Sequence, residues 1–111
     1  MTAWYVAFWD DHCLAFTFDG DAGVWVIVDP RWGRTSVRPV LSAKFDRWLR
    51  MIRRTASILY VGPPGPGLPV QIGFPCVAQV KRLIGSRSGA LLPGALRRDL
   101  LRSGARQAFV R

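Results

Sequence analysis

The side chains best suited to chemistry are Cys76 and His12. Cys76 follows Pro75 in the stretch "GFPCVAQVKRLIG" (73–85), at the predicted start of a helix. The positive end of a helix dipole favours a thiolate, so a cysteine in the first turn can act as a nucleophile. Such a nucleophile needs a base to accept its proton. His12 is the only histidine in the chain and therefore the candidate base.

A predicted β-hairpin brings a carboxylate to this histidine. The segments 12–18 and 24–29 are expected to be strands, joined by the turn sequence "DGDAG". With the turn centred between its second and third residues, His12 faces Asp29, which would orient the ring and favour its charged form. The same register pairs Phe16 with Trp25 and Leu14 with Ile27. A slip of one residue would remove the His12–Asp29 pairing.

Each of these residues also has an ordinary structural interpretation. Cys76 could simply be a core residue, His12 a satisfied polar group, and Asp29 the residue that ends a strand before Pro30. Cys13 should point away from His12 and is expected in the core. A Cys13–Cys76 disulfide and a metal site are both disfavoured, and no cofactor is expected.

The strands and helices that the sequence indicates predict an α+β protein with a single domain, 1–111. We expect an antiparallel β-meander, or a small barrel-like sheet, packed against two or three helices. The predicted strands are 3–9, 12–18, 24–29, 36–40, 57–61 and 70–74, and the predicted helices are 42–55, 75–84 and 93–104. Ser42 is expected to cap the first helix, Pro30 to end the third strand, and Gly85 to stop the second helix. The tail 105–111 is expected to add an edge strand or to lie loose.

The apolar positions of the predicted helices recur at helical spacing and indicate their buried faces. These positions are Phe45, Trp48, Leu49 and Ile52 in the first helix, Val77, Val80, Leu83 and Ile84 in the second, and Leu96, Leu100 and Leu101 in the third.

The charge of the chain is strongly basic, with a formal net charge of +9 and Arg in large excess over Lys. Most of the basic residues lie in the segment 44–111. If this segment binds nucleic acid or another polyanion, the expected contacts are Arg47, Arg50, Arg53 and Arg54. A solvated basic face explains the same pattern. No apolar stretch is long enough to span a membrane, and no secretory signal is recognised, so a cytoplasmic location is expected.

The segments "HCLAF", "VWVIVDP" and "FPCVAQVKRLIG" together resemble the permuted NlpC-like branch of papain-fold proteins. In that branch, as in lecithin:retinol acyltransferase relatives, the histidine strand precedes the cysteine helix. More narrowly, the layout is similar to small proteins of tailed bacteriophages that also carry a segment like "LLPGALRRDLL". The resemblance spans most of residues 4–102 and implies Cys76 as nucleophile, His12 as base and Asp29 as the third polar group. It departs from the family at Phe74-Pro75, where a polar residue often precedes the cysteine.

Three functions follow as hypotheses. The first is a cysteine hydrolase or acyltransferase that acts on an amide or ester, with a peptidoglycan peptide, a host protein and a lipid ester as open alternatives for the substrate, and with a virion as one place where it could be carried. The second is a non-catalytic structural or interaction protein of a phage particle, with Trp4, Trp9 or Trp32 exposed for contacts with other virion proteins. The third is a small nucleic-acid-binding protein. The expected location is the host cytoplasm or the virion.

Overall fold

The computed structural model describes residues 2–109 and has an α+β architecture, as the sequence predicts. Within this range, six strands form one antiparallel sheet in the order β4-β3-β2-β1-β5-β6. The strands are β1 Trp4–Phe8, β2 Cys13–Asp19, β3 Val24–Arg31, β4 Arg34–Val40, β5 Ser57–Gly62 and β6 Arg106–Gln107. The helices are α1 Ser42–Ile52, α2 Pro75–Ile84 and α3 Pro93–Arg102.

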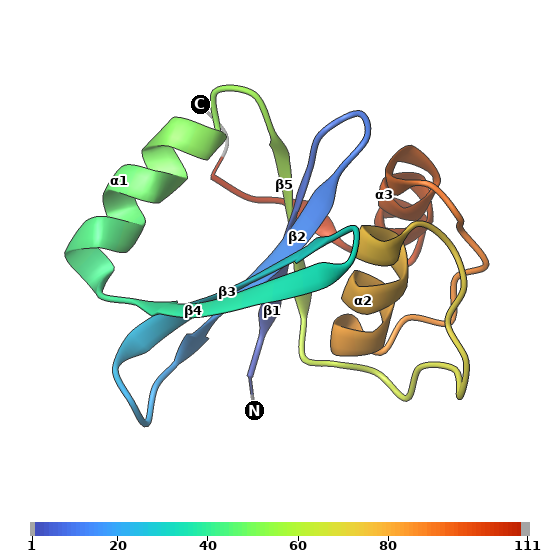
Figure 1. Ribbon diagram of the computed structural model, residues 1–111, viewed down its shortest axis with the longest axis horizontal. Coiled ribbons are helices and arrows are strands. Elements are labelled where there is room, and N and C mark those ends of the chain that lie inside the picture. The colour runs from blue at the N-terminus through green and yellow to red at the C-terminus, as the bar shows by residue number, and fades with distance from the viewer. Residues whose placement is uncertain (1, 110–111) are drawn as a thin grey trace.

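The sheet lies between α1 on one face and α2 with α3 on the other (Figure 1). Alternation along the strands gives each face its own apolar core. In β2, Leu14 and Phe16 join the cluster under α1, whereas Cys13 and Ala15 join the cluster under α2 and α3. The helices bury the expected apolar faces, except that Trp48, Leu83 and Leu101 are only partly buried.

The register of the β2–β3 hairpin differs from the predicted one by two residues. Phe16 pairs with Ile27 and Phe18 pairs with Trp25. Because side chains alternate with a period of two, this shift changes the direct partners but keeps Leu14, Phe16, Trp25 and Ile27 on one face, as predicted.

The ends of several elements differ from the prediction. α1 stops at Ile52, and its N-cap is Leu41 without a side-chain hydrogen bond, so Ser42 is not the cap. Pro30 does not end β3, which continues to Arg31. Pro30 lies beyond the last β2–β3 pair, so its missing N–H costs no hydrogen bond to β2.

The segment 70–74 is not a strand. It contacts the chain at 86–91 through the Gln71 side chain, which donates to the Ser86 carbonyl, and through the Phe74 N–H, which donates to the Leu91 carbonyl. A strand needs a ladder of backbone bonds, and this segment lacks one. In the tail, Arg106 and Gln107 form the expected edge strand beside β5; the prediction for residues 110 and 111 lies outside the described residues.

α2 is held at its C-terminal end by close backbone contact with the loop that precedes it. Gly85 has a φ of +65°, and a Cβ at this position would lie 1.9 Å from the Gly65 carbonyl oxygen. The N–H groups of Gly65 and Gly67 donate to the carbonyls of Ile84 and Gly85. Earlier in α2, the ammonium of the fully buried Lys81 donates to the carbonyls of Ser88 and Ala90.

We predict that Gly85→Ala lowers the free energy of unfolding by more than about 2 kcal/mol, because alanine adds both left-handed backbone strain and a backbone clash. Urea denaturation of the variant and the wild type measures this difference. The control is Gly89→Ala, where a Cβ meets no atom within 4 Å; it should change the stability by less than about 0.5 kcal/mol. Equal stabilities for the two variants would contradict the packing described here.

Candidate functional site

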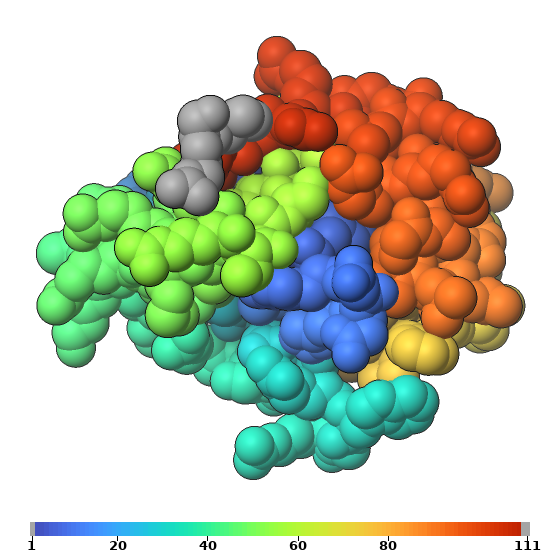
Figure 2. Space-filling view, turned by 90° about the horizontal axis from the view of Figure 1, so that it is seen from above, coloured from blue at the N-terminus to red at the C-terminus, as the bar shows by residue number. Residues whose placement is uncertain are grey.

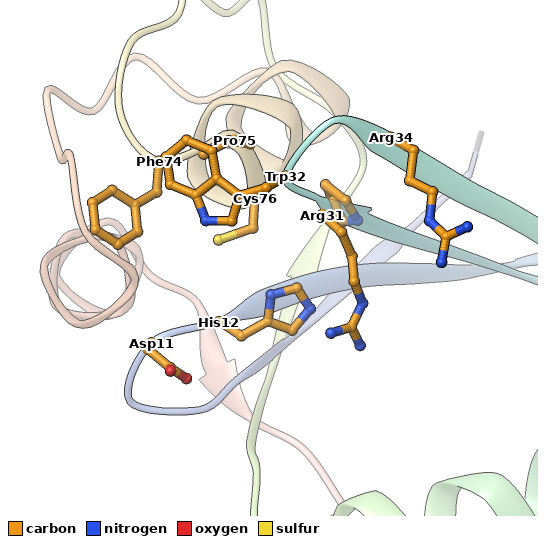
Figure 3. Close-up of a pocket in the computed structure, with 9 residues that line it drawn as sticks. Asp11, His12, Arg31, Trp32, Arg34, Phe74, Pro75 and Cys76 are labelled. Atoms are coloured by element: carbon orange, nitrogen blue, oxygen red, sulfur yellow. The ribbon is translucent and has the colours of Figure 1, made fainter.

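A pocket of about 450 Å³ lies at the N-terminal end of α2. Three segments form it: the β1–β2 turn, the tip of the β3–β4 hairpin and the first turn of α2. They meet on one side of the molecule in Figure 2, where they are blue, teal and yellow. The lining residues, most of them labelled in Figure 3, are Asp11, His12, Pro30, Arg31, Trp32, Arg34, Phe74, Pro75 and Cys76.

Cys76 is the second residue of α2, after Pro75, as the sequence predicts. The proline suits this position because the first backbone N–H groups of a helix have no acceptor within the helix. The Cys76 side chain is 5 % exposed and lies at the floor of the pocket. The thiol therefore combines burial, a helix N-terminus and access to a cavity.

His12 lies in the tight turn between β1 and β2, where the Trp9 N–H donates to the His12 carbonyl over 2.8 Å. Its Nε2 atom is 2.7 Å from Oδ1 of Asp29. The other ring nitrogen, Nδ1, is turned toward the Cys76 sulfur in Figure 3. The structure thus brings all three predicted site residues together, although the hairpin register differs from the expected one.

Asp29 has a second partner, because Nη2 of Arg31 donates to its Oδ2 over 3.1 Å. The carboxylate is only about one-fifth exposed, and both of its oxygens are engaged. An Asp29 held in this way can fix the tautomer and the orientation of the His12 ring.

Cys13 is a core residue, as expected, and it also lies against Cys76. The hydrogen bond from the Cys13 thiol is the largest cause that lowers the pKa of Cys76, to about 6. Burial opposes this shift, whereas the Cys13 backbone N–H, the charge of His12 and a hydrogen bond from His12 lower the pKa further. The same hydrogen bond and complete burial raise the pKa of Cys13. These opposite shifts favour Cys76 over Cys13 as the thiol that ionises.

His12 could not be placed by strand alternation, because it precedes the first residue of β2. Cys13 and Ala15 follow the alternation and face α2, while the turn lets the His12 side chain reach the same helix. The alternation that puts Cys13 on the same face as Ala15 could have indicated that Cys13 lies next to α2. The hairpin tip "RWGR" (31–34), which supplies three lining residues, was missed because its sequence indicates only a loop.

The basic residues predicted to contact a polyanion lie far from this pocket. Arg47 and Arg50 are exposed on α1, and Arg53 and Arg54 follow it; α1 covers the opposite face of the sheet (Figure 1). These positions fit both a solvated face and a polyanion contact. Of the three tryptophans expected to be exposed, Trp32 is 76 % exposed, whereas Trp4 and Trp9 are partly buried against the cores.

Neither a metal site nor a membrane-spanning helix is found in residues 2–109. No group of three or more His, Cys, Asp or Glu side chains in this range is arranged to hold a metal ion. No helix in this range is both long and apolar enough to cross a bilayer. Both cysteines are free.

Family models, curated proteins and solved structures were each compared with the chain, and none of the three comparisons gives a match.

We predict that Cys13→Ala raises the pKa of Cys76 toward that of an ordinary thiol, because the variant lacks the donor. Thiolate absorbance near 240 nm, followed against pH, should show a midpoint at about 6 in the wild type. At pH 7 most of Cys76 is then ionised, whereas an ordinary thiol with a pKa of about 8.5 is mostly protonated. Cys13→Ser keeps a hydrogen-bond donor and should retain most of the shift. An unchanged midpoint in the alanine variant would show that Cys13 does not stabilise the thiolate.

Proposed function

We propose that the protein is a cysteine hydrolase or acyltransferase that acts on an amide or ester bond, with Cys76 as nucleophile and His12 as acid–base group. The observation that carries this proposal is that Asp29, His12 and Cys76 lie next to one another, in that order, at one pocket. Asp29 binds Nε2 of His12, and Nδ1 of His12 points to a thiol whose pKa is lowered. A nucleophile, a base and a group that orients the base are the parts this chemistry needs.

In the first half of the proposed reaction, the Cys76 thiolate attacks the substrate carbonyl and a C–S bond forms. The Cys76 and Val77 N–H groups, at the start of α2, stabilise the resulting oxyanion. The protonated His12 donates its proton to the leaving amine or alcohol as the C–N or C–O bond breaks. The products are the released leaving group and a thioester on Cys76.

In the second half, water or an acceptor alcohol or amine attacks the thioester. Neutral His12 accepts the proton of the attacking group, and the C–S bond breaks to restore the thiolate. Asp29 stabilises the charge that His12 acquires. Arg31 holds Asp29 in place through the second carboxylate oxygen.

The resemblance to permuted papain-fold proteins of tailed phages supports the same assignment of roles and suggests action within a host cell or as part of a virion. Peptide-like substrates, peptidoglycan peptides among them, fit the proposed chemistry.

A non-catalytic role in an assembled particle is the second candidate. It is favoured by large exposed apolar side chains in the pocket, Trp32 and Phe74, and in the two segments that meet at the Phe74–Leu91 backbone hydrogen bond, Ile72, Leu91 and Leu92. Such a set is typical of a contact surface. For this function, Cys76→Ala would leave stoichiometric association with the particle unchanged.

We predict that p-nitrophenyl acetate acylates Cys76, and that His12→Ala slows this acylation at least about 100-fold because the acid–base group is lost. Asp29→Asn should slow it about 10-fold, since the ring loses its orienting carboxylate. Release of p-nitrophenol and the mass of the acetylated peptide measure the rate and the site. Asp46→Asn, at an exposed position on α1, is the matched control and should react like the wild type. Acylation that is indifferent to His12→Ala would refute the hydrolase proposal.

A further inference from the structure

The tip of the β3–β4 hairpin presents two arginines directly opposite each other beside the nucleophile. Arg31 and Arg34 are the last pair of the β3–β4 ladder, and the two-residue turn Trp32-Gly33 joins them. Gly33 permits this tight turn because it adopts a φ of +80°. Both arginines line the pocket, and in Figure 3 they lie on the same side of the Cys76–His12 pair.

The positive charges of these two arginines are not fully balanced by neighbouring carboxylates. Like charges directly opposite each other on adjacent strands destabilise a sheet. Asp29 is bound to Arg31 but also to His12, and within the described residues no carboxylate forms an ion pair with Arg34. An anion that bound between the two guanidinium groups would relieve this repulsion, so the hairpin tip is suited to an anionic ligand.

The other side of the pocket has a different character. The rings of Trp32 and Phe74 lie with their centroids 5.8 Å apart, and both side chains are exposed to solvent. Asp11 lies on the Phe74 side of Cys76 in Figure 3. Its carboxylate repels an anion at that end, and the aromatic pair offers an apolar surface there.

We propose that the substrate is an amide or ester with an anionic group on one side of the scissile carbonyl and an apolar group on the other. The anionic group binds at Arg34 and Arg31, and the apolar group packs on Trp32 and Phe74. This inference rests on the proposed function, because it takes Cys76 as the position of the scissile carbonyl.

The test compares the rates at which iodoacetate and iodoacetamide alkylate Cys76, since the two reagents differ mainly in charge. Peptide mass analysis after a timed reaction at pH 7 and low salt identifies Cys76 as the labelled site. Relative to glutathione, the wild type should favour iodoacetate. Arg34→Gln should lower the iodoacetate/iodoacetamide rate ratio about threefold to tenfold, because one nearby charge is lost. Arg98→Gln removes the same charge from an exposed position on α3 and should leave the ratio unchanged.

The apolar side is tested with N-phenyl iodoacetamide against iodoacetamide. Trp32→Ala should lower this second ratio about threefold, because the phenyl ring loses its stacking partner. Met51→Ala, an exposed apolar residue on α1, is the control and should keep the wild-type ratio. Both substituted residues, Arg34 and Trp32, are exposed, so the variants are expected to fold.

Different results would contradict anion recognition at the hairpin tip and catalysis by Cys76. If Arg34→Gln and Arg98→Gln both keep the wild-type ratio, anion recognition at the hairpin tip is wrong, while a reactive, His12-dependent Cys76 would still stand. If Cys76 reacts with both reagents at the pH of an ordinary thiol and independently of His12, the catalytic proposal fails and the substrate inference fails with it.

Discussion

The docking of the first turn of α2 onto the ends of β2 and β3 is the constraint on which the site depends. A slide of one helical turn, about 5.4 Å, would take the Cys76 sulfur away from the imidazole. Val77 and Val80 resist such a slide because both are fully buried against the sheet. The contact of Gly85 with the loop at Gly65 fixes the other end of the helix. The unusual proline- and glycine-rich loop is therefore part of what positions the nucleophile.

The polar groups of the site form one chain of contacts from the core to the rim of the pocket. The Cys76 side chain is followed by His12, then by Asp29 and finally by Arg31. Burial of a thiolate is costly, and this chain of contacts together with the donors on Cys13 offsets the cost. Arg31 therefore helps to orient the His12 ring through Asp29.

The sequence predicts the fold well in helices and strands, where buried apolar residues recur at regular spacing. It predicts the fold less well in turns and loops, where no such spacing exists. α2 begins at Pro75 and ends before Gly85 as expected, because proline, an apolar stripe and glycine all indicate the same boundaries. The hairpin register was wrong by two residues, yet His12 and Asp29 still meet, because His12 lies in the turn before β2, outside the strand alternation. No pattern could place the tip at Trp32, because the position of a turn over a pocket depends on long-range packing.

The two cysteines show how environment separates identical side chains. Cys13 is enclosed in the sheet core with no exposed surface, so ionisation there would leave a charge without solvent. Cys76 is also buried, but it lies at a helix N-terminus, beside an imidazole and at the floor of a pocket. These surroundings raise the pKa of the Cys13 thiol and lower that of Cys76. The division of roles follows from position alone: with the strand thiol unable to ionise, its proton becomes part of what stabilises the nucleophile on the helix.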